Sequence, residues 1–139
     1  MRKLIIEALS RVLDNLLKDV NIYYETTKQD LKLPCFNIMF IKSSSKHLLG
    51  GTYRLENPIH IVFISKTNEK FDLLDIAEQM EKCLEILPIT DNFKIRGTNM
   101  SFEIEDDILN FFIEYDFNVR ELEKFKNLME NLEVNINGK

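Results

Sequence analysis

The sequence has few of the residue types that build metal centres, disulfide frameworks or membrane spans. Its 139 residues include two His, two Cys, four Gly, three Pro and no Trp. Neither His47 nor His60 is followed three or four positions later by another metal-binding side chain, so a zinc site is not indicated. No apolar run approaches the roughly 20 residues that a transmembrane helix requires. We therefore expect no metal, no cofactor and no membrane partner.

The two cysteines, Cys35 and Cys83, each lie within an apolar run. We predict that both are buried, reduced thiols that behave as small hydrophobic side chains; a disulfide between them is the alternative. Arg2 and Lys3 are followed by an amphipathic pattern rather than by the apolar core of a signal peptide. Synthesis in a reducing cytoplasm is therefore expected.

The length and composition indicate one ordinary globular domain. Hydrophobic residues make up 45% of the chain and charged residues 29%, and 139 residues are enough to bury a core without disulfides or metals. The net charge of −5 argues against a duplex nucleic-acid binder, because such proteins neutralise phosphates with basic side chains. Sequence-specific nucleic acid is therefore not an expected partner.

The periodicity of apolar residues predicts an α+β fold, with a mostly antiparallel sheet and helices packed on one face, in the order α-β-β-β-α-β-β-α. The predicted helices span residues 2–19 and 71–87, the second capped by 67–69, and the predicted strands span 21–25, 35–41, 52–65, 93–105 and 109–119. The domain is expected to occupy residues 1–120, and residues 121–139 to form a helical extension with a frayed end.

Three local expectations accompany this pattern. Pro58 interrupts a strand, so we expect an edge position or a bulge there. Asp106 and Asp107 join two alternating runs as a hairpin turn. In the second run the odd-numbered residues are expected to face the core: Leu109, Phe111, Ile113, Tyr115, Phe117 and Val119.

Side-chain patterns of catalysis are weak in this sequence. The acidic cluster around the expected hairpin turn reads as a solvated turn, with a cation site as the alternative; it contains Glu103, Glu105, Asp106 and Asp107. Nucleophilic catalysis needs a nucleophile, a base and an orienting group. Ser43, Ser44 and Ser45 lie near His47, but a run of serines in a flexible loop is usually only part of that loop. The pair Gly50-Gly51 lacks the spacing of a phosphate-binding loop. An enzyme is not expected.

The segment Lys42–Arg54 is basic and partly apolar within an acidic protein. We expect its first part to be a polar loop with little intrinsic structure, and we interpret the segment as an arm that contacts a neighbouring subunit or the tube, or that lines the lumen. The alternative is that its leucines pack under the protein's own sheet. Its candidate interface residues are Lys42, Lys46, His47, Leu48, Leu49, Gly50, Gly51, Tyr53 and Arg54.

A second candidate site is Arg96 and Gly97, which lie inside an expected strand. A strand glycine suggests a bulge or a close approach of two backbones.

Residues 31–63 and 95–120 carry a resemblance to a known family. The features that match, in order along the chain, are Pro34-Cys35-Phe36, the basic segment before Tyr53-Arg54, Pro58, Arg96-Gly97-Thr98 and Val119-Arg120. In this order they resemble the tail terminators of Gram-positive phages, defective prophages and phage-tail-like bacteriocins. The resemblance covers residues 1–120, and the turn at Asp106-Asp107 departs from it, because relatives tend to carry Gly there.

The resemblance implies a structural subunit that forms a ring, with six copies expected, on the head-proximal end of a tail tube. The ring would stop tube polymerisation and present a surface to sheath, neck or collar proteins, after assembly in the bacterial host cytoplasm. Two alternatives remain open. One is another neck or head–tail completion protein, and the other is a small binding module unconnected with particles.

Overall fold

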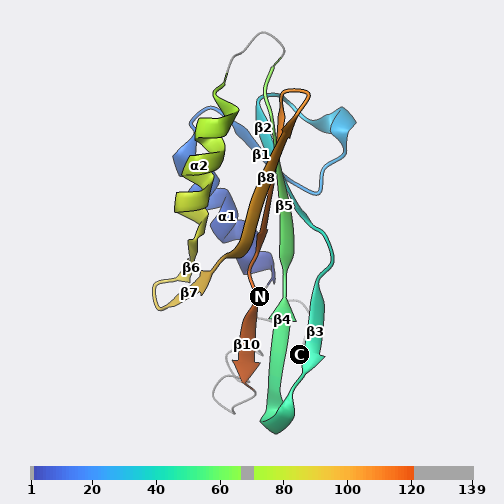
Figure 1. The fold of residues 1–139 in the computed structure, drawn as a ribbon, viewed down its shortest axis with the longest axis vertical. Helices are drawn as coiled ribbons and strands as arrows, with labels where there is room; N and C mark the ends of the chain where they lie inside the picture. Colours follow the sequence, from blue (N-terminus) through green and yellow to red (C-terminus); the bar gives the residue numbers. More distant parts are fainter. Residues whose placement is uncertain (1, 67–70, 121–139) are drawn as a thin grey trace, which may run out of the picture.

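Five strands form the main sheet, in the order β1-β2-β5-β9-β8 (Figure 1). The computed structural model describes residues 2–66 and 71–120. Only β1 and β2 pair in parallel, and the other neighbours in this sheet are antiparallel. The strands are β1 (Asn21–Tyr24), β2 (Cys35–Phe40), β5 (Pro58–Ile64), β8 (Thr98–Glu105) and β9 (Ile108–Glu114).

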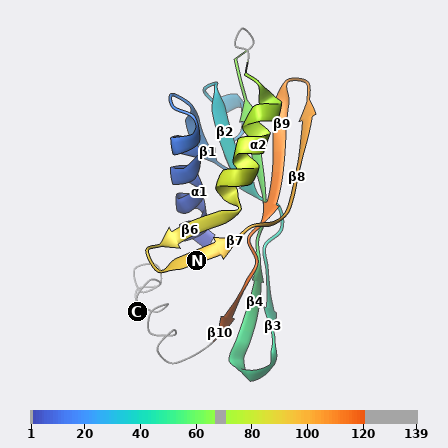
Figure 2. The same cartoon turned by 60° about the vertical axis from the view of Figure 1, so that its left-hand side comes forward.

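Two helices, α1 (Arg2–Leu16) and α2 (Leu73–Leu84), cover one face of this sheet (Figures 1 and 2). The apolar stripe of each helix packs against alternate residues of the strands, because side chains of a strand point to opposite faces in turn. The α+β class, the mostly antiparallel sheet and the one-sided packing are thus confirmed. The core includes Ile5, Leu9, Leu13, Phe36, Ile38, Ile59, Ile61, Phe63, Ala77, Met80, Leu84, Leu109, Phe111 and Ile113.

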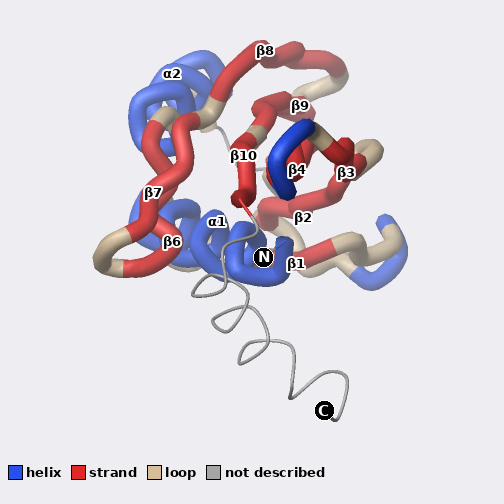
Figure 3. Tube along the Cα trace, turned by 90° about the horizontal axis from the view of Figure 1, so that it is seen from below, coloured by secondary structure: helices blue, strands red, loops and turns tan. Residues whose placement is uncertain are grey.

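Three further strands form a second sheet that projects beyond one end of the main sheet (Figures 1 and 2). They are β3 (Ser44–His47), β4 (Thr52–Glu56) and β10 (Phe117–Arg120), in the order β10-β4-β3. We call residues 42–57 and 115–120 the arm. Seen along the long axis from this end, the arm strands lie in front of the main sheet, with α1 and α2 to one side (Figure 3).

The expectation that Pro58 lies at a sheet edge or in a bulge was wrong. Residues 52–65 form two strands, β4 and β5, separated by Asn57, and Pro58 is the first residue of β5 in the centre of the main sheet. It occupies neither an edge nor a bulge. The first position of a strand tolerates proline because the missing N–H is not needed for the ladder there.

A small hairpin of β6 (Ile86–Thr90) and β7 (Phe93–Arg96) was not foreseen. The second helix was expected to reach residue 87, but it ends at Leu84 and Leu87 lies in β6. The expected strand 93–105 is likewise divided, at Gly97, into β7 and β8. The N-cap of α2 is Asp72, whose carboxylate accepts a hydrogen bond from the Asp75 amide at 3.2 Å. The expected cap at 67–69 and the helix at 121–133 lie outside the described residues.

The predicted hairpin and its register are confirmed. The turn residues Asp106 and Asp107 have φ angles of 51° and 61°, which are the paired positive values of a type I′ turn. The odd-numbered residues face inward, although the run is divided into β9 and β10. Five of the six are buried, at Leu109, Phe111, Ile113, Tyr115 and Val119, and Phe117 is half-buried.

The two cysteines differ in their surroundings. Cys35 is buried as predicted, and burial raises the pKa of its thiol. Cys83 is exposed on α2, so the expectation that it is buried was wrong. The apolar residues around it in sequence form the helix's inward stripe at Ala77, Met80 and Leu84, and position 83 lies off that stripe. Both thiols are free.

Candidate functional site

The arm is a regular hairpin, so the expectation of a loop with little intrinsic structure was wrong. Strands β3 and β4 pair in register from Ser44–Glu56 to His47–Tyr53. A short 3-10 turn, Leu49–Gly51, joins them, and the Leu48 amide donates to the Thr52 carbonyl at 2.7 Å. Gly50 has a φ of 71°, which a residue with a Cβ rarely adopts. Strand β10 pairs with the other edge of β4, so the hairpin is supported along its length.

The end of the arm presents two apolar side chains to solvent. Leu49 is 96% exposed and Leu48 is 45% exposed. The alternative that these leucines pack under the protein's own sheet is therefore contradicted. An almost fully exposed leucine at the end of a supported hairpin is a typical anchor for a protein contact, because burying it in a partner removes apolar surface from water.

Ion pairs run along both strands of the arm hairpin. The Lys46 ammonium lies 2.8 Å from a Glu56 carboxylate oxygen, and this hydrogen bond lowers the pKa of Glu56. Arg54 lies 3.8 Å from the Asp116 carboxylate and donates to the Asn118 side chain at 3.4 Å.

The arm also contains an aromatic contact and carries a net positive charge. The His47 and Tyr53 rings meet edge to face with centroids 4.4 Å apart. Lys42 is exposed at the start of the arm. With four Lys or Arg and two acids, the arm carries about +2, and the other residues together carry −7 because the whole chain carries −5.

The junction between arm and main sheet is a buried polar cluster that sequence reasoning missed. Asn57 is fully buried, and its side chain donates to the Tyr115 carbonyl and accepts from the Arg2 guanidinium, each at 2.9 Å. Its backbone amide donates to Asp116 at 2.9 Å. Arg2 also reaches the Ser44 carbonyl at 3.2 Å. These bonds fix the arm to the N-terminal turn of α1. An Asn-Pro pair between two strand patterns was the available signal, because this pair favours a change of direction.

At the second predicted site, Arg96 and Gly97, the chain is tightly packed around the glycine. A Cβ at Gly97 would meet the Ile113 side chain at 2.9 Å or less and the Leu84 carbonyl at 3.0 Å. The close approach expected of this glycine is therefore confirmed. Its amide donates to the Glu85 carbonyl at 2.7 Å, and Arg96 lies exposed 4.0 Å from the Glu85 carboxylate.

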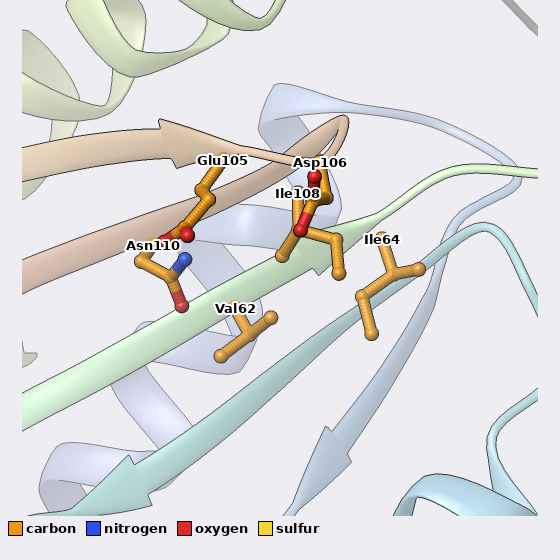
Figure 4. Close-up of a pocket in the computed structure, with 6 residues that line it drawn as sticks. All are labelled: Val62, Ile64, Glu105, Asp106, Ile108 and Asn110. Carbon is orange, nitrogen blue, oxygen red and sulfur yellow. The ribbon is translucent and has the colours of Figure 1, made fainter.

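The sheet face opposite the helices carries a half-buried apolar surface with an acidic margin. Near the β8–β9 turn it contains a hollow of ≈ 390 Å³, lined by Val62, Ile64, Glu105, Asp106, Ile108 and Asn110 (Figure 4). Beside it, His60 stacks on Phe112 with ring centroids 4.6 Å apart, and its Nε2 lies 2.8 Å from the Asn110 side-chain oxygen. We call the six lining residues the sheet hollow.

Within residues 2–66 and 71–120, no cluster of three metal-binding side chains occurs. In the same part of the chain no helix is both long and apolar enough to cross a membrane.

Comparisons with known proteins place the chain in a family. No curated protein matches the sequence. Among the solved structures that match, one aligns over 84% of this chain and 96% of its own length, with 11% identity and a TM-score of 0.41. The family described as phage tail terminator protein matches residues 4–127, nearly the whole chain. The chain therefore belongs to the phage tail terminator family, a family of structural tail proteins.

Proposed function

We propose that this protein forms a ring on the head-proximal end of a phage or phage-tail-like tube and terminates its polymerisation. Membership of the tail terminator family over residues 4–127 is the observation that carries the proposal. Six copies are the expected number, and assembly in the bacterial host cytoplasm is the expected route. The direct partners would be the tail tube protein and, above the ring, sheath, neck or collar proteins.

The arm supplies the contact surface for this role. A ring requires a heterologous interface that closes on rotation, so each subunit must present two different surfaces. Hydrogen bonds of Asn57 and Arg2 tie the arm to α1 and to β10, and the arm ends in the exposed Leu48 and Leu49. A positively charged arm on a negatively charged subunit also lowers the like-charge repulsion that a ring of acidic proteins must overcome.

The test is to replace Lys46, Leu48 and Leu49 together with Ser and to follow both folding and capping. The variant should fold, because the two leucines are exposed and Lys46 is 64% exposed. Tubes assembled with it should lose their uniform length, as measured by electron microscopy. The matched control is Leu74→Ser, which removes a 52% exposed leucine on α2 and should leave tube length unchanged.

Three outcomes would contradict the proposed function or the role proposed for the arm in it. Tubes of normal length without the protein would exclude termination. Normal capping by the triple variant would make the arm a passive connection. Labelled protein found only away from the head-proximal end of the tube would favour another neck component.

A further inference from the structure

We infer that the arm tip of one copy docks into the sheet hollow of a second copy, so that subunits join head to tail. This inference deepens the proposed function, on which it rests, by naming the two surfaces that meet. The occupant of the hollow is the Leu48–Leu49 tip of another copy of this chain.

The two surfaces have matching chemistry. The floor of the hollow is apolar, formed by Val62, Ile64 and Ile108. These residues belong to the helix-free face of β5 and β9, and they are only half-buried. The hollow is open to solvent and has a volume of ≈ 390 Å³. An apolar tip on an apolar floor removes both surfaces from water.

The charges around the two surfaces are opposite. Glu105 and Asp106 line the hollow, with Glu103 and Asp107 beside them in sequence, and no ion pair among the described residues neutralises any of the four. The arm carries about +2. Because Lys46 and Arg54 are paired with Glu56 and Asp116, this excess comes from the exposed Lys42 and Arg120, and Arg120 lies opposite Thr52 beside the tip. Charge complementarity of this kind orients two proteins as they meet and disfavours the reverse pairing.

The positions of the two surfaces exclude pairing within one chain. Two views of the molecule place the β8–β9 turn at one end and the arm tip at the opposite end (Figures 1 and 2). The junction at Asn57 holds the arm pointing away from the main sheet. The tip of a chain can therefore meet only the hollow of another chain. This arrangement is heterologous, and it closes into a ring when the rotation between neighbours divides a full turn.

Cysteine cross-linking tests the contact directly. In a Cys83→Ser background, the pair Leu49→Cys and Glu105→Cys should give a ladder of disulfide-linked oligomers, both in free protein and on tail tubes. All three positions are exposed, so these changes should not disturb folding. In the control pair, Leu74→Cys on α2 replaces Glu105→Cys, and it should give no ladder.

A mixing experiment tests the direction of pairing. Leu48→Ser with Leu49→Ser removes the tip, and Val62→Arg places a cation in the hollow. Each variant alone should sediment as a monomer, whereas an equal mixture should give heterodimers and nothing larger, because one tip and one hollow remain intact. The inference would be overturned if either variant alone formed oligomers of the size seen for the unmutated protein, or if the mixture stayed monomeric. Circular dichroism and thermal melting establish that each variant is folded.

The outcomes separate this inference from the proposed function. If the Leu49–Glu105 cross-link forms but the protein has no effect on tube length, the docking stands and the proposal of tube termination is refuted. Capped tubes without the Leu49–Glu105 cross-link would keep termination and refute the docking. A cross-link from Leu49→Cys to the tail tube protein in place of Glu105→Cys would also refute it, because the tube would then be the occupant.

Discussion

Replacing Asn57 with Ala should weaken the junction that holds the arm, and the structure gives the size of the effect. The substitution leaves the buried Tyr115 carbonyl without the donor that reaches it at 2.9 Å, which costs about 1–3 kcal/mol. It also removes the 2.9 Å bond from Arg2, a part-buried contact worth about 1 kcal/mol. Together the free energy of unfolding should fall by about 2–4 kcal/mol.

Two measurements report this loss. Thermal unfolding followed by circular dichroism should show a melting temperature lower by roughly 6–16 °C, because a domain of this size shifts by about 3–4 °C per kcal/mol. Hydrogen exchange should rise most in the arm strands, β3, β4 and β10, because they lose their tie to α1 while the main sheet keeps its ladder. The control is Asn118→Ala, which removes an exposed partner of Arg54 and should cost under about 0.5 kcal/mol.

The reasoning would be refuted by either of two results. One is a loss below about 0.5 kcal/mol for Asn57→Ala, which would mean that the buried network contributes no more than a surface contact. The other is hydrogen exchange of the arm amides in Asn57→Ala that is no faster than in Asn118→Ala, which would mean that the arm does not depend on the junction for its position.

Three further predictions concern the core, the tight approach and the arm hairpin. Phe111→Ala should lower the free energy of unfolding by about 3–5 kcal/mol in urea titrations, because this fully buried ring would leave a cavity; a loss near zero would contradict the register of β9. Gly97→Ala should cost about 1–3 kcal/mol in the same assay, because its Cβ would overlap Ile113, and an unchanged midpoint would contradict the close approach. The hydrogen bond from Lys46 lowers the pKa of Glu56 below its ordinary 4.5, so its contribution to the hairpin is present above that pH and is lost as the pH falls through the lowered pKa. Arm amides should therefore lose protection faster than main-sheet amides below about pH 4.5. If Glu56→Gln shows the same extra loss of arm protection at low pH, protonation of Glu56 is not its cause.

Local sequence chemistry was sufficient for the parts of the fold that depend on one segment at a time. The i, i+3, i+4 spacing of Ile5, Leu9 and their neighbours fixed α1, because a helix with one apolar stripe has one face to bury. The alternation from Leu109 to Tyr115 fixed which side chains enter the core, since a slip of one residue would invert the strand. The family resemblance drew on the order of such features along residues 31–120.

Only the tertiary structure decided the features that depend on partners distant in sequence. Residues 42–51 look irregular by themselves, because Ser, Lys and Gly have little strand propensity, and they become a strand and turn only when β4 and β10 provide the ladder. Asn57 became a junction only when folding brought Arg2 and Tyr115 to it. The sheet hollow combines residues of β5 with residues of β8 and β9, about 40 positions further along the chain. Periodicity reports which face of a segment is apolar, but the neighbours of that face are set by the packing of the whole chain.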